Sequence, residues 1–186
     1  MPAPALTLLL WLLAVGSARA GEVEEAEARR ISVELKERVT EARWEAADDL
    51  YRRLRLLPGV DLAYDDHWRG FLAAQALGDA VAQADRLAAA RAEDATAEVD
   101  AAEALLMAWY GRVELRLARK LHPRPPLTMD QVPFEADQRR VLEAAAAALA
   151  EEGRYAGLLP LGMYRIGATG FEVVGEEEPV RVHVRR

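Results

Sequence analysis

Cysteine is absent from this sequence of 186 residues. Disulfide bonds, thiolate nucleophiles and zinc–thiolate sites are therefore excluded together, and no lipid-modified N-terminal cysteine is expected. Serine is nearly absent too, because Ser32 is the only serine after residue 20 and it lies in a predicted helix. With three histidines besides, the chain has little material for a nucleophile–base–acid arrangement. We therefore expect neither enzyme activity nor a cofactor.

A basic excess is also lacking, because 24 lysines and arginines stand against 31 aspartates and glutamates, for a net charge of -7. This balance opposes a general nucleic-acid-binding role. Two local groups of arginine remain, and each either keeps the protein soluble or contacts an acidic partner or an anionic polymer of the cell envelope. The groups are Arg43, Arg52, Arg53 and Arg55, and Arg181, Arg185 and Arg186.

Only one long hydrophobic run occurs, from Ala5 to Val15. It is shorter than the stretch of about 20 apolar residues that spans a bilayer. Ala18-Arg19-Ala20 then provides the small residues that a signal peptidase recognises. We expect residues 1–20 to be a cleaved signal peptide, with an uncleaved anchor or a buried helix as alternatives. The mature protein would be periplasmic or secreted and would meet a membrane only during export.

Proline and glycine divide the rest of the chain. Residues 22–57 contain neither, whereas glycine is dense from Gly153 onward. We predict a helical repeat-like domain over residues 21–110, a strand- and proline-rich connection over residues 111–134, and a helix with a small β-module over residues 135–186. The predicted fold class is mainly α: an antiparallel helix-turn-helix array followed by a C-terminal module that contains a β-hairpin.

Apolar residues recur at helical spacing in the first part, and the positions between them are charged or alanine. Tight connections between these segments favour antiparallel neighbours. The stripes are Ile31, Leu35, Val39 and Ala42; Ala47, Leu50, Tyr51, Leu54 and Leu57; Tyr64, Trp68, Phe71, Leu72 and Gln75; Val81, Ala84, Leu87 and Ala88; and Ala102, Leu105, Leu106 and Trp109.

The last part alternates between apolar and polar residues. Residues 163–166 and 171–174 predict a hairpin, and the valines of residues 180–184 predict a third strand. Residues 113–117 alternate as well and are either a strand or a helix. An alanine-rich helix is predicted over residues 137–152, with Gly153 placed to end it. His122, in the proline-rich loop, and His183, opposite the valines, are expected to face solvent.

Residues 42–54 run toward Pro58 and place the small Ala47 and the aromatic Tyr51 on one face. This segment resembles the second helix of a tetratricopeptide repeat. A second unit, with Trp68 and Phe71 in the first-helix positions, leads through Leu77-Gly78-Asp79 to Ala84, 37 residues after Ala47. The family repeats at about 34 residues. The resemblance implies stacked helix pairs with a concave protein-binding surface. Leu159–Tyr164 is similar to a turn that opens strands in small β-modules of exported bacterial proteins.

Together these features predict an exported scaffold or adaptor that binds a protein partner through its helices. An alternative is a cell-envelope binding module that works through the C-terminal β-segment. For each tryptophan, packing in the core is the first explanation, and an exposed one would be an anchor for the partner. The candidate partner-binding residues are Trp44, Arg52, Arg53, Trp68 and Trp109.

A further alternative is an enzyme or metal site at Asp65, Asp66 and His67. Adjacent residues of a helix point in different directions, so the three side chains are not expected to converge. Aspartates are favoured near the positive end of a helix dipole. We therefore expect a helix start at this segment, and no metal.

Overall fold

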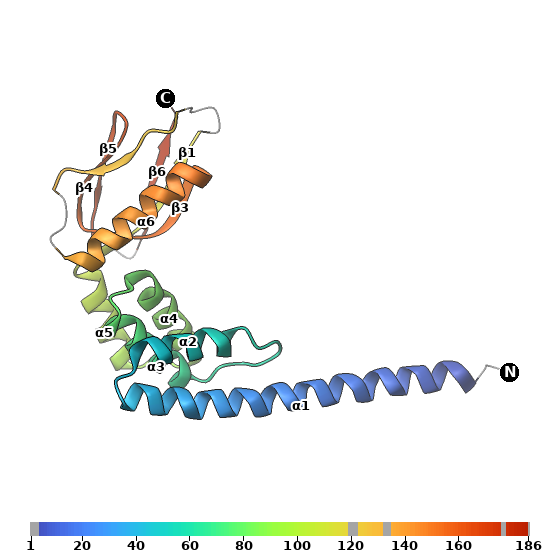
Figure 1. The fold of residues 1–186 in the computed structure, drawn as a ribbon. Coiled ribbons are helices and arrows are strands. Elements are labelled where there is room, and N and C mark those ends of the chain that lie inside the picture. Colours follow the sequence, from blue (N-terminus) through green and yellow to red (C-terminus); the bar gives the residue numbers. More distant parts are fainter. Residues whose placement is uncertain (1–3, 119–122, 132–134, 176–177, 186) are drawn as a thin grey trace.

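The computed structural model describes residues 4–118, 123–131, 135–175 and 178–185, with side chains from residue 22 onward. The described part places helices in its N-terminal half and strands with one covering helix in its C-terminal half (Figure 1). The predicted fold class, mainly α with a small C-terminal β-module, is confirmed. The helices are α1 (Pro4–Thr40), α2 (Trp44–Arg55), α3 (Tyr64–Ala76), α4 (Ala80–Glu93), α5 (Ala97–Met107) and α6 (Ala136–Glu152). The strands are β1 (Tyr110–Leu117), β2 (Leu127–Met129), β3 (Arg154–Pro160), β4 (Gly162–Ile166), β5 (Thr169–Val173) and β6 (Val180–Val184).

Helix α1 is much longer than the others, and its N-terminal half extends away from the rest of the molecule (Figure 1). It includes residues 4–20 of the segment predicted as a signal peptide. Among the described residues, no helix combines the length and the apolar character that a membrane span requires. Export and cleavage near Ala20 stay predictions.

The first four helices form two helical hairpins, α1–α2 and α3–α4, and α3 packs against both members of the first hairpin. The second predicted stripe is confirmed, because Ala47, Leu50, Tyr51 and Leu54 are buried in the core between α1 and α2. Helix α3 has two buried faces: Ala73 belongs to this first core, whereas Phe71 belongs to a second core. The array is therefore held by α3, its central helix.

The predicted stripe of α4 is wrong in part. Val81 is 42% exposed, whereas the polar Gln83 and Arg86 are buried beside Leu87. The predicted stripe of α5 is also wrong in part, because Leu106 is buried while Leu105 is 68% exposed. Arg86 of α4 is buried for an electrostatic reason, because a buried carboxylate on α2 requires a cation opposite it.

That carboxylate belongs to Asp48, which pairs with Arg86. The Arg86 guanidinium is 4% exposed, also donates to the carbonyl oxygen of Gly70 at 2.6 Å, and lies 4.5 Å above the ring of Tyr51. Gly70 is required here, because a Cβ atom at this position would lie 2.6 Å from the Tyr51 ring. One side chain of α4 thus contacts both α2 and α3, with its charge neutralised and a hydrogen bond from each terminal nitrogen.

The strands form two three-stranded sheets within the described residues, in the orders β3-β1-β6 and β2-β4-β5. The predicted hairpin is confirmed as β4–β5, and residues 113–117 lie in a strand, β1. Val180–Val184 is the predicted third strand, but it pairs in parallel with β1 and not with the hairpin. The predicted connection over residues 111–134 therefore supplies strands β1 and β2 to the C-terminal module.

Helix α6 covers the sheets and buries Ala145 and Leu149 against residues such as Val113 and Tyr164. It begins and ends almost where the sequence predicts. Gly153 follows it with a φ of 74°, a left-handed conformation that glycine adopts without steric cost. The end of the helix at Gly153 is thus confirmed.

The second core joins the helical part to the β-module. Phe71 and Leu87 of the helices pack there with Tyr110 of β1, Val141 of α6 and Leu158 of β3. Because apolar area is removed from water on both sides, this contact fixes the module against α3, α4 and α5.

Replacing Arg86 by Met should destabilise the protein by about 3–5 kcal/mol, because it leaves the buried Asp48 carboxylate without its main partner. The double variant Arg86→Met, Asp48→Leu should be more stable than Arg86→Met alone, since no buried charge then remains unpaired. Urea-induced unfolding followed by circular dichroism measures both effects.

The matched control is Arg55→Met, which removes an ion pair with Asp85 whose side chains are 48% and 66% exposed. This change should shift the unfolding free energy by about 1 kcal/mol or less. A double variant no more stable than Arg86→Met would show that the unpaired charge is not the cause of the loss.

Candidate functional site

Helix α5 presents an apolar face to solvent. Trp109, just after the helix, is 64% exposed, and Leu105 one turn earlier is 68% exposed. Hydrogen bonds from the amides of Ala108 and Trp109 to carbonyl oxygens of the last turn continue the helical path to Trp109. We define the outer α5 face as the exposed residues Ala97, Ala101, Ala104, Leu105, Ala108 and Trp109.

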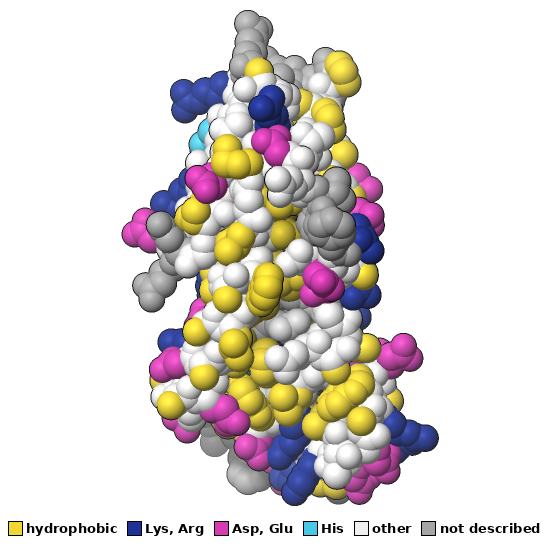
Figure 2. Space-filling view, turned by 90° about the vertical axis from the view of Figure 1, so that its left-hand side faces the viewer, with side chains coloured by type: hydrophobic (Ala, Val, Ile, Leu, Met, Phe, Trp, Pro, Cys, Tyr) yellow, Lys and Arg dark blue, Asp and Glu magenta, His cyan; other side chains and the backbone are white. Residues whose placement is uncertain are grey.

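The members of this face recur at intervals of three and four residues, the spacing by which a helix normally buries one side. Yet α5 already buries another side, through Val99 and Leu106. A helix that is apolar on two sides is usually packed against other residues on both. Here none of the described residues of the chain packs over the second side. Figure 2 shows the side that lies on the left in Figure 1, where hydrophobic side chains gather over the helical half.

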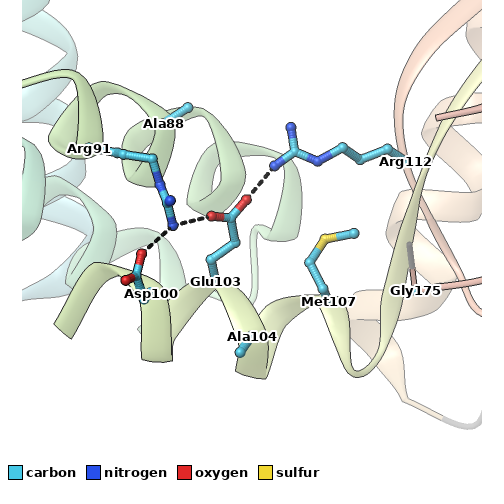
Figure 3. Close-up of a pocket in the computed structure, with 8 residues that line it drawn as sticks. All are labelled: Ala88, Arg91, Asp100, Glu103, Ala104, Met107, Arg112 and Gly175. Carbon is cyan, nitrogen blue, oxygen red and sulfur yellow. Dashed lines mark hydrogen bonds and ion pairs between the residues drawn. The ribbon is translucent and has the colours of Figure 1, made fainter. Parts of the chain in front are cut away.

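A groove of about 720 Å³ adjoins the outer α5 face and shares Ala104 with it. It lies between α4, α5 and the start of β1, with Met107 and Gly175 at one end (Figure 3). Its wall is a chain of ion pairs. Glu103 accepts from Arg91 and from Arg112, each at 2.6 Å, and Arg91 also reaches Asp100 at 2.7 Å.

This chain of ion pairs links α4, α5 and β1, so the three elements that line the groove are connected to one another. The carboxylates of Asp100 and Glu103 are neutralised by the two arginines, and Figure 3 shows both guanidinium groups directed at Glu103. Networks of partly buried ion pairs hold geometry better than isolated surface pairs.

The charge beside the outer α5 face is acidic. Residues 92–111 contain no lysine, arginine or histidine. The exposed carboxylates of Glu93, Asp94 and Glu98 make no ion pair or hydrogen bond with any described residue. An exposed apolar stripe is therefore flanked at its N-terminal end by uncompensated negative charge.

Of the predicted contact residues, the structure places only Trp109 on this site, and the core packing first expected for it is wrong. Trp68 lies partly buried between the rings of Tyr64 and Phe71, at centroid distances of 6.2 and 4.9 Å. Trp44 packs against the first core. These two tryptophans therefore do what core packing predicts.

The predicted arginines lie apart from Trp109 and have acidic neighbours. Arg52 pairs with Asp48 at 2.8 Å, and Arg53 lies 3.6 Å from Glu27. The residues that sequence reasoning missed are Leu105, which it assigned to the core, and the outward alanines. The signal that could have found them is that α5 carries apolar residues on more than one side, including Val99, Leu105 and Leu106.

The segment Asp65-Asp66-His67 forms the first turn of α3, as the helix-start interpretation expected. Its side chains do not converge on one point, although Arg69 pairs with both Asp65 and Asp66, with Asp66 at 3.2 Å. Asp65 pairs with Arg69 at 2.7 Å, Asp66 accepts from Ser32 at 2.6 Å, and His67 Nδ1 shares a hydrogen bond of 2.9 Å with the Tyr51 hydroxyl. Within the described ranges, no three His, Asp or Glu side chains converge as metal ligands.

Burial lowers the pKa of His67 below its ordinary value; Arg55 adds to this lowering, while Glu93 and Asp66 oppose it. The neutral form of the His67 imidazole is thus favoured in the folded protein, and in this form the ring can share a hydrogen bond with Tyr51. His183 is exposed on β6, as expected. His122 lies outside the described residues.

Comparison with known proteins found no matching family model, curated protein or solved structure. The resemblance to a tetratricopeptide repeat stays a prediction. The site is therefore defined by the exposure, spacing and charge of its own residues.

Trp109→Ala should change the free energy of unfolding by about 0.5 kcal/mol or less, because this side chain is mostly in water. Trp68→Ala should cost about 3 kcal/mol, since it leaves a void between two rings in the second core. Urea-induced unfolding of the two variants measures the difference. A large loss with Trp109→Ala would mean that the outer α5 face is covered in solution.

Stability should fall as the pH is lowered below about 6.5, the ordinary pKa of histidine. The pKa of His67 is lower in the folded than in the unfolded protein, so the unfolded state binds more protons and the unfolding free energy rises with pH. In His67→Gln, this slope between about pH 5 and 7 should flatten, as measured by urea unfolding at several pH values. His183→Gln, which changes an exposed histidine, should keep the slope; a slope lost in both variants would contradict the assignment.

Proposed function

We propose that this protein is a non-catalytic adaptor, acting after export, that binds a helix of a partner protein on the outer α5 face. The observation that carries the proposal is the exposed stripe that ends in Leu105 and Trp109. Aromatic residues, tryptophan above all, are the usual anchors of protein–protein interfaces. The predicted surface thus moves from Trp44 and Trp68, which are packed, to α5.

The composition of the stripe favours a helix as the ligand. Its four alanines allow another backbone to approach closely, because interaxial distances between packed helices depend on the side chains at the contact. Leu105 and Trp109 then supply the larger contacts at one end. Residues at this spacing lie on one face of a helix, where a second helix can pack, and the groove beside Ala104 offers room for a polar side chain of the ligand.

Charge selects among such helices. The carboxylates of Glu93, Asp94 and Glu98 lie unpaired beside the stripe, so a ligand with lysine or arginine on its rim is favoured over an acidic one. The partner we propose is therefore a basic amphipathic helix. Like-charge contacts at the rim would exclude acidic helices.

Two synthetic peptides test this prediction: amphipathic helices with the same leucine face, one with lysine and one with glutamate on its rim. The lysine peptide should bind residues 21–186 and shift the combined emission of Trp44, Trp68 and Trp109 to shorter wavelength, because binding removes the Trp109 indole from water. The glutamate peptide should bind at least about tenfold more weakly. The double variant Asp94→Lys, Glu98→Lys should reverse the preference.

Trp109→Ala should weaken binding of the lysine peptide by about 2 kcal/mol, the loss expected for an anchor. Leu56→Ala is the matched control, since Leu56 is 81% exposed but lies at the end of α2. In pull-downs from envelope extract, a partner should be retained by wild type and Leu56→Ala and lost by Trp109→Ala. Equal binding by all three chains would overturn the proposal.

A further inference from the structure

A second surface, on the β3-β1-β6 sheet, carries charge of the opposite sign. The strand register places Arg154 of β3 opposite Arg116 of β1, and Arg116 beside His183 of β6. Three nitrogen-bearing side chains thus form one row across three strands. We define the basic sheet face as this row together with Arg181 and Arg185.

Strand alternation directs these side chains to solvent. Leu115, Val182 and Val184 occupy the alternate positions and are buried in the core of the module. Arg116 and His183 are accordingly exposed on the other side. The row lies at the end of the sheet remote from α5, because β1 starts beside that helix and runs away from it (Figure 1).

Little negative charge neutralises this face within the described residues. Arg181 lies 3.4 Å from Glu114, and Arg154 lies 3.2 Å from Glu152 in a pair whose side chains are 77% and 58% exposed. No described carboxylate pairs with Arg116, His183 or Arg185. The face is thus cationic in a chain whose net charge is -7.

The arrangement has a cost for the folded protein. Residues directly opposite each other on antiparallel strands have Cβ atoms about 4.5–5.5 Å apart, and like charges at such a pair are destabilising. Arg116 and Arg154 form such a pair. An anion that binds both guanidinium groups would remove this repulsion and gain charge-assisted hydrogen bonds.

We infer that the basic sheet face binds a linear polymer that carries phosphate groups, such as a phosphate-containing polymer of the cell envelope. A phosphate has oxygens on more than one side, so it can accept from both neighbouring guanidinium groups, whereas a single carboxylate matches one fork. His183 adds an N–H donor in either protonation state. Arg181 and Arg185 extend the face along β6 for the next groups of the polymer.

Two other classes of anionic ligand fit the face less well. None of the exposed large hydrophobic residues of the described chain lies on it, so it lacks a wedge for insertion into a bilayer. It also has no Phe, Tyr or Trp side chain, the large aromatic platforms on which successive nucleic-acid bases stack. Vesicles and single-stranded DNA are therefore the contrasting ligands of the test.

The probe is inorganic polyphosphate, titrated into the mature chain by calorimetry at about 0.15 M salt, where the Debye length is about 8 Å. Wild type should bind. Arg116→Gln, Arg154→Gln should bind at least about tenfold more weakly and should show a shallower dependence of log K on log salt, because fewer phosphates are neutralised. The thermal midpoint of this variant should not fall, because the substitutions remove a repulsive pair.

The control Arg29→Gln, Arg43→Gln removes the same charge from side chains that are 72% and 62% exposed on other surfaces. It should keep its affinity for polyphosphate within about twofold, a change of under 0.5 kcal/mol. An equal loss in both variants, or no binding by wild type, would overturn the inference. So would equally tight binding to polygalacturonate, to single-stranded DNA or to vesicles of phosphatidylglycerol.

Discussion

The buried guanidinium group of Arg86 is the contact on which the helical part depends. A chain without cysteine has no disulfide to hold its helices, so their positions come from packing and from this ion pair with Asp48. The group also donates to the Gly70 carbonyl and lies on the Tyr51 ring, so it connects α4 with α2 and α3 at one point. A buried pair of this kind adds little net stability, but any rearrangement that separates its partners is costly. It therefore specifies which face of α4 turns inward.

The face of α4 that turns inward determines how the other elements pack. With Arg86 turned inward, Leu87 and Ala90 of α4 reach the second core, where Tyr110 and Leu158 of the β-module pack against them. The chain of ion pairs from Arg91 through Glu103 to Arg112 crosses the same junction at the surface. The outer α5 face and the basic sheet face are thus held at fixed positions on one body.

Sequence periodicity predicted those helices and strands whose apolar pattern fits only one type of secondary structure. The α2 stripe, the end of α6 at Gly153 and the β4–β5 hairpin all depend on neighbours close in the chain. It did not predict β3, whose Gly157 and Pro160 are unusual in a strand and whose place comes from pairing with β1. It predicted α5 as a helix but not which of its faces is buried, because an apolar stripe shows that a face favours cover but not which partner supplies it. Only the tertiary packing leaves Leu105 and Trp109 outside.

The two surfaces share a physical property, which is that each makes the isolated fold less favourable. Exposed Leu105 and Trp109 leave apolar area in water, and Arg116 opposite Arg154 brings like charges together. Neither feature supports the core, and this is why we propose a ligand that covers the one and a ligand that neutralises the other. At physiological salt, charges farther apart than about 8 Å are largely screened. The exposed carboxylates of Glu93, Asp94 and Glu98 near α5 and the basic sheet face lie toward opposite ends of β1. They therefore do not neutralise each other, and each surface keeps its own charge.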